Sequence, residues 1–81
     1  MYEEIEARVI GLVAKHAQRP DATRDTHLID DLGMDALDIV EVIMATETEF
    51  DVSITEETAD CVRTVGDIVD AVIKAKKEER V

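Results

Sequence analysis

Residues 31–50 read DLGMDALDIVEVIMATETEF, and this stretch decides the fold because a turn in it leads into an amphipathic helix. Gly33 supplies the backbone freedom that a turn needs. Asp35 is placed as an N-cap, with Asp38 three residues later in a weak capping-box pattern. At about 100° per residue, one side of this helix gathers residues expected to face the core: Ile39, Val42, Ile43, Thr46 and Phe50. The pattern predicts a helix that continues to about Phe50.

A second stripe, formed by Leu37, Val40 and Met44, follows the same helix. A helix that is apolar on two sides is either deeply buried or presents one side to a partner. Full burial is disfavoured because the helix also carries four acidic residues, Asp38, Glu41, Glu47 and Glu49. We therefore expect the second stripe to face a partner and to be rimmed by carboxylates.

The rest of the chain predicts two further long helices and one short helix. The first helix is expected from Tyr2 to about Ala17, with one face made of Tyr2, Ile5, Val9, Leu12, Val13 and His16. Thr55 is placed to cap a short helical turn that ends near Cys61. A last helix is expected to start at Thr64, with an apolar face made of Val65, Ile68, Val69, Val72 and Ile73. The sequence thus predicts one all-α domain over residues 1–81, with a charged tail that frays from about residue 78.

The long connection over residues 18–34 is of a length that is often functional. Its apolar pair, Leu28 and Ile29, is expected to insert into the core. Thr46 is a polar residue on the core face. It either narrows an internal cavity or donates its hydroxyl to a carbonyl one turn back. Met34 is left open as a core residue or a partner contact, and Cys61 is expected to be partly buried.

The charge indicates the class of partner. The net charge is −11, and no lysine or arginine lies between Arg24 and Arg63. Such a block disfavours nucleic acid and anionic membranes and favours the basic surface of a protein. No apolar stretch of about 18 residues predicts a membrane span, and the acidic N-terminus does not look like a signal peptide. A single cysteine fits a reducing compartment, so a cytoplasmic monomer is expected.

The segment from Asp31 to Asp38 resembles the D-L-G-x-D-S-L signature of the acyl carrier protein family. Residues 40–45 and 49–54 resemble the second helix of that family and the turn after it. Residues 64–67 resemble the start of its last helix. The resemblance covers the chain from the first helix to about Lys74 and implies a small four-helix bundle of the acyl-carrier type, with three longer helices and one short one.

The resemblance also implies a function. In the family, a serine takes 4′-phosphopantetheine from coenzyme A, and the arm shuttles acyl chains as thioesters between enzymes of fatty-acid or related lipid biosynthesis. Such a protein is a carrier and no catalyst. Its partners are a phosphopantetheinyl transferase and acyl-chain-processing enzymes: synthases, reductases, dehydratases and acyltransferases.

The chain departs from the signature at the attachment position, where Ala36 replaces the serine. Alanine has no hydroxyl, so 4′-phosphopantetheine cannot be attached there. We favour a Ser→Ala change introduced to keep the protein unmodified. Two alternatives stay open: a natural carrier-like module that binds proteins without carrying a chain, and a polyketide or peptidyl carrier of a specialised pathway.

The candidate site therefore consists of the attachment position and a docking surface around it. The residues expected to contact partners are Asp35, Leu37, Asp38, Val40, Glu41, Met44, Glu47, Glu56 and Asp60. His16 and His27 lie in no nucleophile or metal-ligand pattern, so no catalytic residue is assigned. The aspartates of residues 30–38 do not fit an EF-hand loop, so no metal site is assigned.

Overall fold

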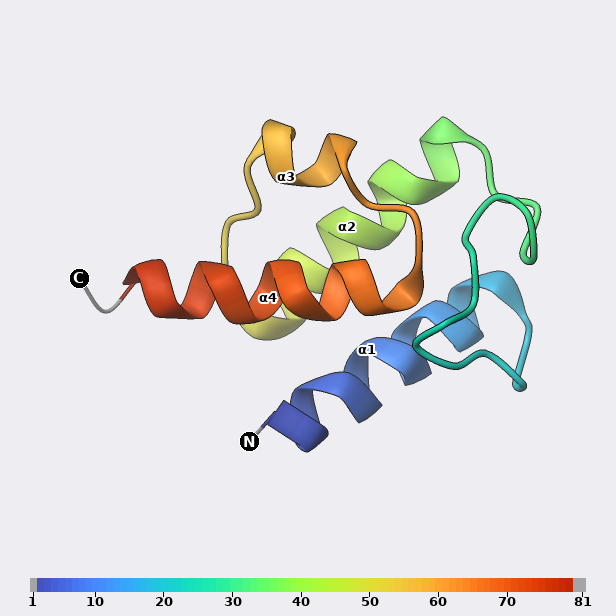
Figure 1. The fold of residues 1–81 in the computed structure, drawn as a ribbon, viewed down its shortest axis with the longest axis horizontal. Coiled ribbons are helices and arrows are strands. Elements are labelled where there is room, and N and C mark those ends of the chain that lie inside the picture. Colours follow the sequence, from blue (N-terminus) through green and yellow to red (C-terminus); the bar gives the residue numbers. More distant parts are fainter. Residues whose placement is uncertain (1, 80–81) are drawn as a thin grey trace.

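The computed structural model describes residues 2–79, which form four helices (Figure 1). They are α1 (Tyr2–Ala17), α2 (Ala36–Phe50), α3 (Glu56–Asp60) and α4 (Val65–Glu79). The predicted all-α class is confirmed, with three longer helices and one short one in the expected order. Helix α4 continues through residues 78 and 79, where the sequence predicted a frayed tail, and residues 80–81 lie outside the described part.

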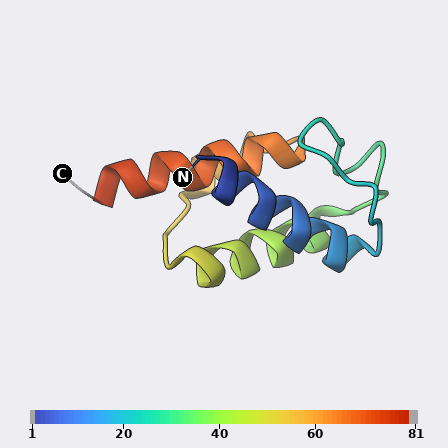
Figure 2. The same ribbon diagram turned by 90° about the horizontal axis from the view of Figure 1, so that it is seen from below.

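The three long helices enclose an aliphatic core. Helix α1 runs obliquely across α2 and α4, which Figure 2 shows from below. The fully buried apolar side chains come from all three helices and from the loops: Val9, Val13, Leu28, Val42, Val65, Ile68, Val69 and Val72. Phe50 is the one buried aromatic side chain among the described residues. Burial of this aliphatic surface supplies the main driving force for folding.

Thr46 is the one polar residue fully buried among the described residues. Its hydroxyl donates a hydrogen bond of 2.8 Å to the carbonyl of Val42, one turn back. This bond satisfies a group whose burial would otherwise be unfavourable. The second sequence interpretation of Thr46 is therefore confirmed.

Side-chain caps define where each of the last three helices begins. The Asp35 carboxylate accepts from the Asp38 backbone N–H at 2.9 Å, and the Asp38 carboxylate accepts from the Asp35 N–H at 3.3 Å. The predicted capping box is thus confirmed. Thr55 caps α3 by accepting from the Thr58 N–H, and the Thr64 hydroxyl accepts from the Asp67 N–H at the start of α4.

The C-terminal end of α2 receives its positive charge from other helices. Its last turn contains no basic residue. Arg8 of α1 pairs with the Glu49 carboxylate and lies 4.6 Å from the centre of the Phe50 ring. Lys76 of α4 donates to the Phe50 carbonyl at 3.4 Å. Cations near a helix C-terminus are stabilising, so α2 keeps an acidic surface and still has its end stabilised.

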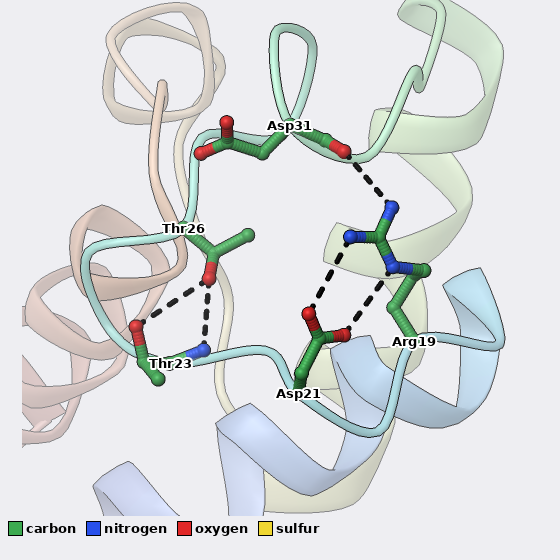
Figure 3. Close-up of polar contacts among 5 residues, drawn as sticks. All are labelled: Arg19, Asp21, Thr23, Thr26 and Asp31. Atoms are coloured by element: carbon green, nitrogen blue, oxygen red, sulfur yellow. Dashed lines mark hydrogen bonds and ion pairs between the residues drawn. The ribbon is translucent and has the colours of Figure 1, made fainter.

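Polar contacts hold the long connection between α1 and α2 in place (Figure 3). The Arg19 guanidinium reaches both the Asp21 carboxylate and, at 3.1 Å, the Asp31 carbonyl. The Thr26 hydroxyl accepts from the Thr23 N–H at 2.8 Å. These bonds satisfy backbone groups that no helix satisfies, so the connection is an ordered element of the fold.

Two predictions about side-chain burial are wrong. Leu28 is buried as expected, but Ile29 is 49% exposed. The Leu28 N–H donates to the Arg63 carbonyl at 2.9 Å, which fixes Leu28 against the core and leaves its neighbour outside. Cys61 is exposed because it is the C-cap at the outer end of α3.

The predicted face of α1 is buried only in its middle. Ile5, Val9 and Val13 are buried, whereas Tyr2 and His16 at the two ends are exposed. No helix in the described part of the chain combines the length and apolar character needed to cross a bilayer.

Candidate functional site

Position 36 lies at the leading end of α2, directly after the Asp35 cap. Ala36 is the first residue of the helix and is exposed. The unpaired N–H groups and the positive end of the helix dipole lie here, and both favour a nearby anion. A phosphodiester on this residue would therefore meet a suitable electrostatic environment, and a partner can reach the position from solvent.

The chemistry of the side chain does not fit covalent attachment. The Ala36 methyl group has no lone pair with which to form an ester, so the chain as it stands cannot hold the implied prosthetic group at this position. The position fits the group in exposure and electrostatics, and it lacks only the oxygen.

The second stripe of α2 is exposed to solvent, as the sequence predicted. Leu37 is 66% exposed, Val40 50% and Met44 59%. These three residues account for most of the large apolar side chains that the described part of the chain exposes, and they follow position 36 along one side of the helix. Continuous exposed apolar surface rimmed by charge is typical of an interaction site.

The structure divides the predicted acidic rim into two groups. Asp35, Glu41, Glu56 and Asp60 are exposed. Asp38 and Glu47 are partly buried and have structural partners. The Asp38 carboxylate belongs to the capping box, and the Glu47 carboxylate accepts from the Ile54 N–H at 2.8 Å. These two carboxylates therefore hold the ends of α2 and its following loop while also contributing negative charge.

Two other candidates are assigned by their surroundings. Met34, left open by the sequence, is buried and belongs to the core. His16 lies at the exposed end of α1, with its Nε2 3.5 Å from the Glu41 carboxylate. This pair was not predicted, because the two residues are far apart in the chain.

The turn before position 36 is built around His27 and Gly33. The His27 N–H donates to the Asp31 carboxylate at 2.8 Å, and His27 Nδ1 accepts from the Asp30 N–H at 3.1 Å. Gly33 adopts φ +67, a conformation that favours glycine, and donates its N–H to the Ile29 carbonyl at 2.9 Å. The turn thus sets the position at which α2 begins.

Ile29 is the exposed residue that sequence reasoning placed wrongly. It lies in this turn. Figure 1 shows that the connection from α1 to α2 runs at the end of the molecule where α2 begins. Its neighbours Asp30 and Asp31 are also exposed. The only signal in the sequence was the position of an apolar residue directly before two aspartates.

Comparison with known proteins gives consistent results. The family described as "Phosphopantetheine attachment site" matches residues 7–72. The chain is similar to the acyl carrier protein of Syntrophobacter fumaroxidans, at 38% identity over 89% of this chain and 91% of the relative. It is also similar to the acyl carrier protein of Clostridium acetobutylicum, at 53% identity over 73% of this chain and 79% of the relative.

A solved structure shows the same arrangement of helices. It is described as a putative acyl carrier protein from Mycobacterium tuberculosis. It superposes with a TM-score of 0.80 at 30% identity, covering 86% of this chain and 96% of that one.

Proposed function

The chain belongs to the acyl carrier protein family, and from that premise we propose that α2 docks onto acyl-chain-processing enzymes with position 36 as the tether point. Family members carry acyl chains and are not catalysts, and their cofactor is 4′-phosphopantetheine. The pathway that we propose is fatty-acid or related lipid biosynthesis.

One observation carries the proposal: an exposed apolar stripe begins beside an exposed helix N-terminus. Leu37, Val40 and Met44 would remove apolar surface from water on docking, at about 25 cal/mol per Å². A partner that covers the stripe also comes next to residue 36. The same contact therefore binds the carrier and presents its tether point.

The acidic rim selects the partner. Asp35, Asp38, Glu41, Glu47, Glu56 and Asp60 give the rim its negative charge, and we propose that they meet lysine and arginine side chains of the enzyme. Complementary charge of this kind raises the association rate and disfavours wrong partners. Synthases, reductases, dehydratases, acyltransferases and the phosphopantetheinyl transferase are the partners that the surface fits.

Ala36 limits what this form of the chain does. It can dock, but it cannot be loaded at position 36. We propose that it is a Ser→Ala form of a carrier, because the cap, the turn and the exposure of the position all suit a loaded residue. The net charge of −11 favours a fatty-acid-type carrier over a peptidyl carrier. We further propose that it acts as a cytoplasmic monomer, because a lone exposed cysteine is suited to a reducing compartment.

The test restores the serine. Ala36→Ser is incubated with coenzyme A and a phosphopantetheinyl transferase, beside the Ala36 chain as a matched control, and both are weighed by mass spectrometry. We expect Ala36→Ser to gain one 4′-phosphopantetheine group and the control to gain nothing. A restored chain without added mass contradicts the carrier function. A gain of mass by the Ala36 chain would contradict the assignment of position 36. It would point to Ser53, the only serine of that chain, as the residue that accepts the group.

A further inference from the structure

The docking stripe covers only one side of position 36. Leu37, Val40 and Met44 all follow that position along α2. A standard protein interface buries about 800 Å² on each partner, which is more than three partly exposed side chains provide. A partner centred on position 36 must therefore also contact the surface that precedes it.

Ile29 lies on that other side, and the fold keeps it exposed. Its side chain is 49% exposed, and it is the large apolar side chain that the turn before α2 presents to solvent. Its carbonyl accepts from the Gly33 N–H at 2.9 Å, and three extended residues from Gly33 to Ala36 span about 11 Å at most. The Ile29 carbonyl oxygen and position 36 are therefore separated by about 14 Å at most.

The turn is rigid, so Ile29 is presented in a fixed place. Leu28, the preceding residue, is fully buried, and its backbone N–H donates a hydrogen bond to the Arg63 carbonyl. The Asp31 carboxylate and the His27 ring close the turn on either side. The Arg19 guanidinium donates a hydrogen bond of 3.1 Å to the Asp31 carbonyl. A preorganised contact loses little conformational entropy on binding.

The surroundings of Ile29 repeat those of the stripe. An apolar side chain is followed by exposed carboxylates, here Asp30 and Asp31. The same partner chemistry, an apolar pocket edged with lysine or arginine, fits both. The turn therefore offers a partner the same combination of apolar surface and negative charge as α2.

We propose that Ile29 is a second apolar anchor of the docking surface, used by the phosphopantetheinyl transferase. This proposal rests on the proposed function. An enzyme that modifies residue 36 itself must bring its active site to the Cβ of that residue and so covers both sides of it. An enzyme that acts at the far end of a flexible arm needs no such approach. Ile29 therefore serves the partner that comes closest.

The Ala36 chain makes the test a simple binding measurement, because the complex cannot react. The dissociation constant for a phosphopantetheinyl transferase with bound coenzyme A is measured by calorimetry for the Ala36 chain and for its Ile29→Ala variant. Removing a half-exposed isoleucine that docking buries should weaken binding about five- to tenfold. Ile29→Val should stay within about twofold of the Ala36 chain, since it keeps most of the apolar surface.

Two controls separate the possible failures. Met44→Ala tests the contribution of the stripe on α2. Ile29→Asp adds a negative charge at the proposed anchor, and Ala7→Asp is its matched control, because it adds the same charge at an exposed residue of α1. Circular dichroism confirms that each variant remains helical. We expect Met44→Ala, Ile29→Ala and Ile29→Asp to weaken binding, and Ala7→Asp to have little effect.

The outcomes are distinct. If Met44→Ala weakens binding and Ile29→Ala does not, the second anchor is wrong while the proposed function stands. If neither variant changes binding, or the Ala36 chain does not bind, the proposed function fails together with the anchor. A dimer of the chain alone that Ile29→Ala abolishes in sedimentation would assign the contact to a second copy and overturn the proposal.

Discussion

Asp67 shows how a single side chain secures the start of a helix. Its carboxylate accepts from the backbone N–H groups of Arg63 and Thr64, at 2.8 and 3.0 Å. Burial alone would raise the pKa of Asp67, but these two hydrogen bonds, the bond to the Thr64 hydroxyl and the charge of Arg63 lower it below the ordinary value. The ionised carboxylate therefore stabilises the folded chain.

The sign of the pH dependence follows from that lowered pKa. Because the folded-state pKa lies below the unfolded one, the stabilisation is complete above about pH 4 and is lost as the pH falls through the folded-state pKa. Asp67→Asn should lower the free energy of unfolding at pH 7, and the difference from the Ala36 chain should shrink below about pH 4. Urea unfolding at pH 7 and pH 3 measures both; a difference that does not vary with pH would contradict the assignment.

At position 36, one missing side-chain atom determines whether a group can be attached. Its place on the helix, its exposure and its electrostatic surroundings all suit a tethered anion, and only the missing hydroxyl oxygen prevents attachment. Alanine is a favourable helix residue, so the substitution leaves α2 intact. The exposed stripe of Leu37, Val40 and Met44 is therefore retained in a chain that cannot be loaded at position 36.

At the scale of the helix, α2 combines two roles that compete. In the proposed function its exposed face attracts basic partners and so must stay acidic, yet a helix C-terminus is stabilised by positive charge. The structure separates the two, because Arg8 of α1 and Lys76 of α4 supply the charge from outside α2. A basic residue on α2 itself would have weakened the rim.

Removing Arg8 should therefore weaken α2 specifically. Arg8→Met loses the pairing with Glu49 and the contact with the Phe50 ring, which together contribute about 1 kcal/mol for partly exposed groups. The matched control Lys77→Met removes a positive charge that is exposed on α4. Urea unfolding should show a larger loss for Arg8→Met; equal losses would mean that only the net charge matters.

At the scale of the whole molecule, local patterns correctly predicted the helices and the exposure of the apolar stripe on α2. The caps at Asp35, Thr55 and Thr64 and the spacing of Leu37, Val40 and Met44 depend on neighbours within one or two turns. The sequence therefore shows them directly. This is why the helix order and the exposed stripe were predictable.

The features that sequence reasoning missed depend on contacts between distant segments. Ile29 is exposed because its neighbour Leu28 bonds to Arg63, beyond α3. Glu47 is partly used to hold Ile54 in the loop after α2. The His16–Glu41 pair joins two helices. Periodicity within one segment does not contain such information.

The charge of the whole molecule acts on association with partners. With a net charge of −11, the chain attracts a basic surface over about one Debye length, about 8 Å at physiological ionic strength. We expect the acidic residues of α2 then to orient the chain relative to the basic surface of its partner. Docking should thus depend on both the local rim and the salt concentration.

The most direct test measures the association rate of the chain with a basic, carrier-dependent synthase by stopped flow. Glu41→Lys is compared with Glu3→Lys, an equal charge change at an exposed residue of the first turn of α1. We predict that Glu41→Lys slows association about tenfold at low salt, that the difference shrinks as salt is added, and that Glu3→Lys has much less effect. An association rate that Glu41→Lys leaves unchanged at low salt would contradict the account.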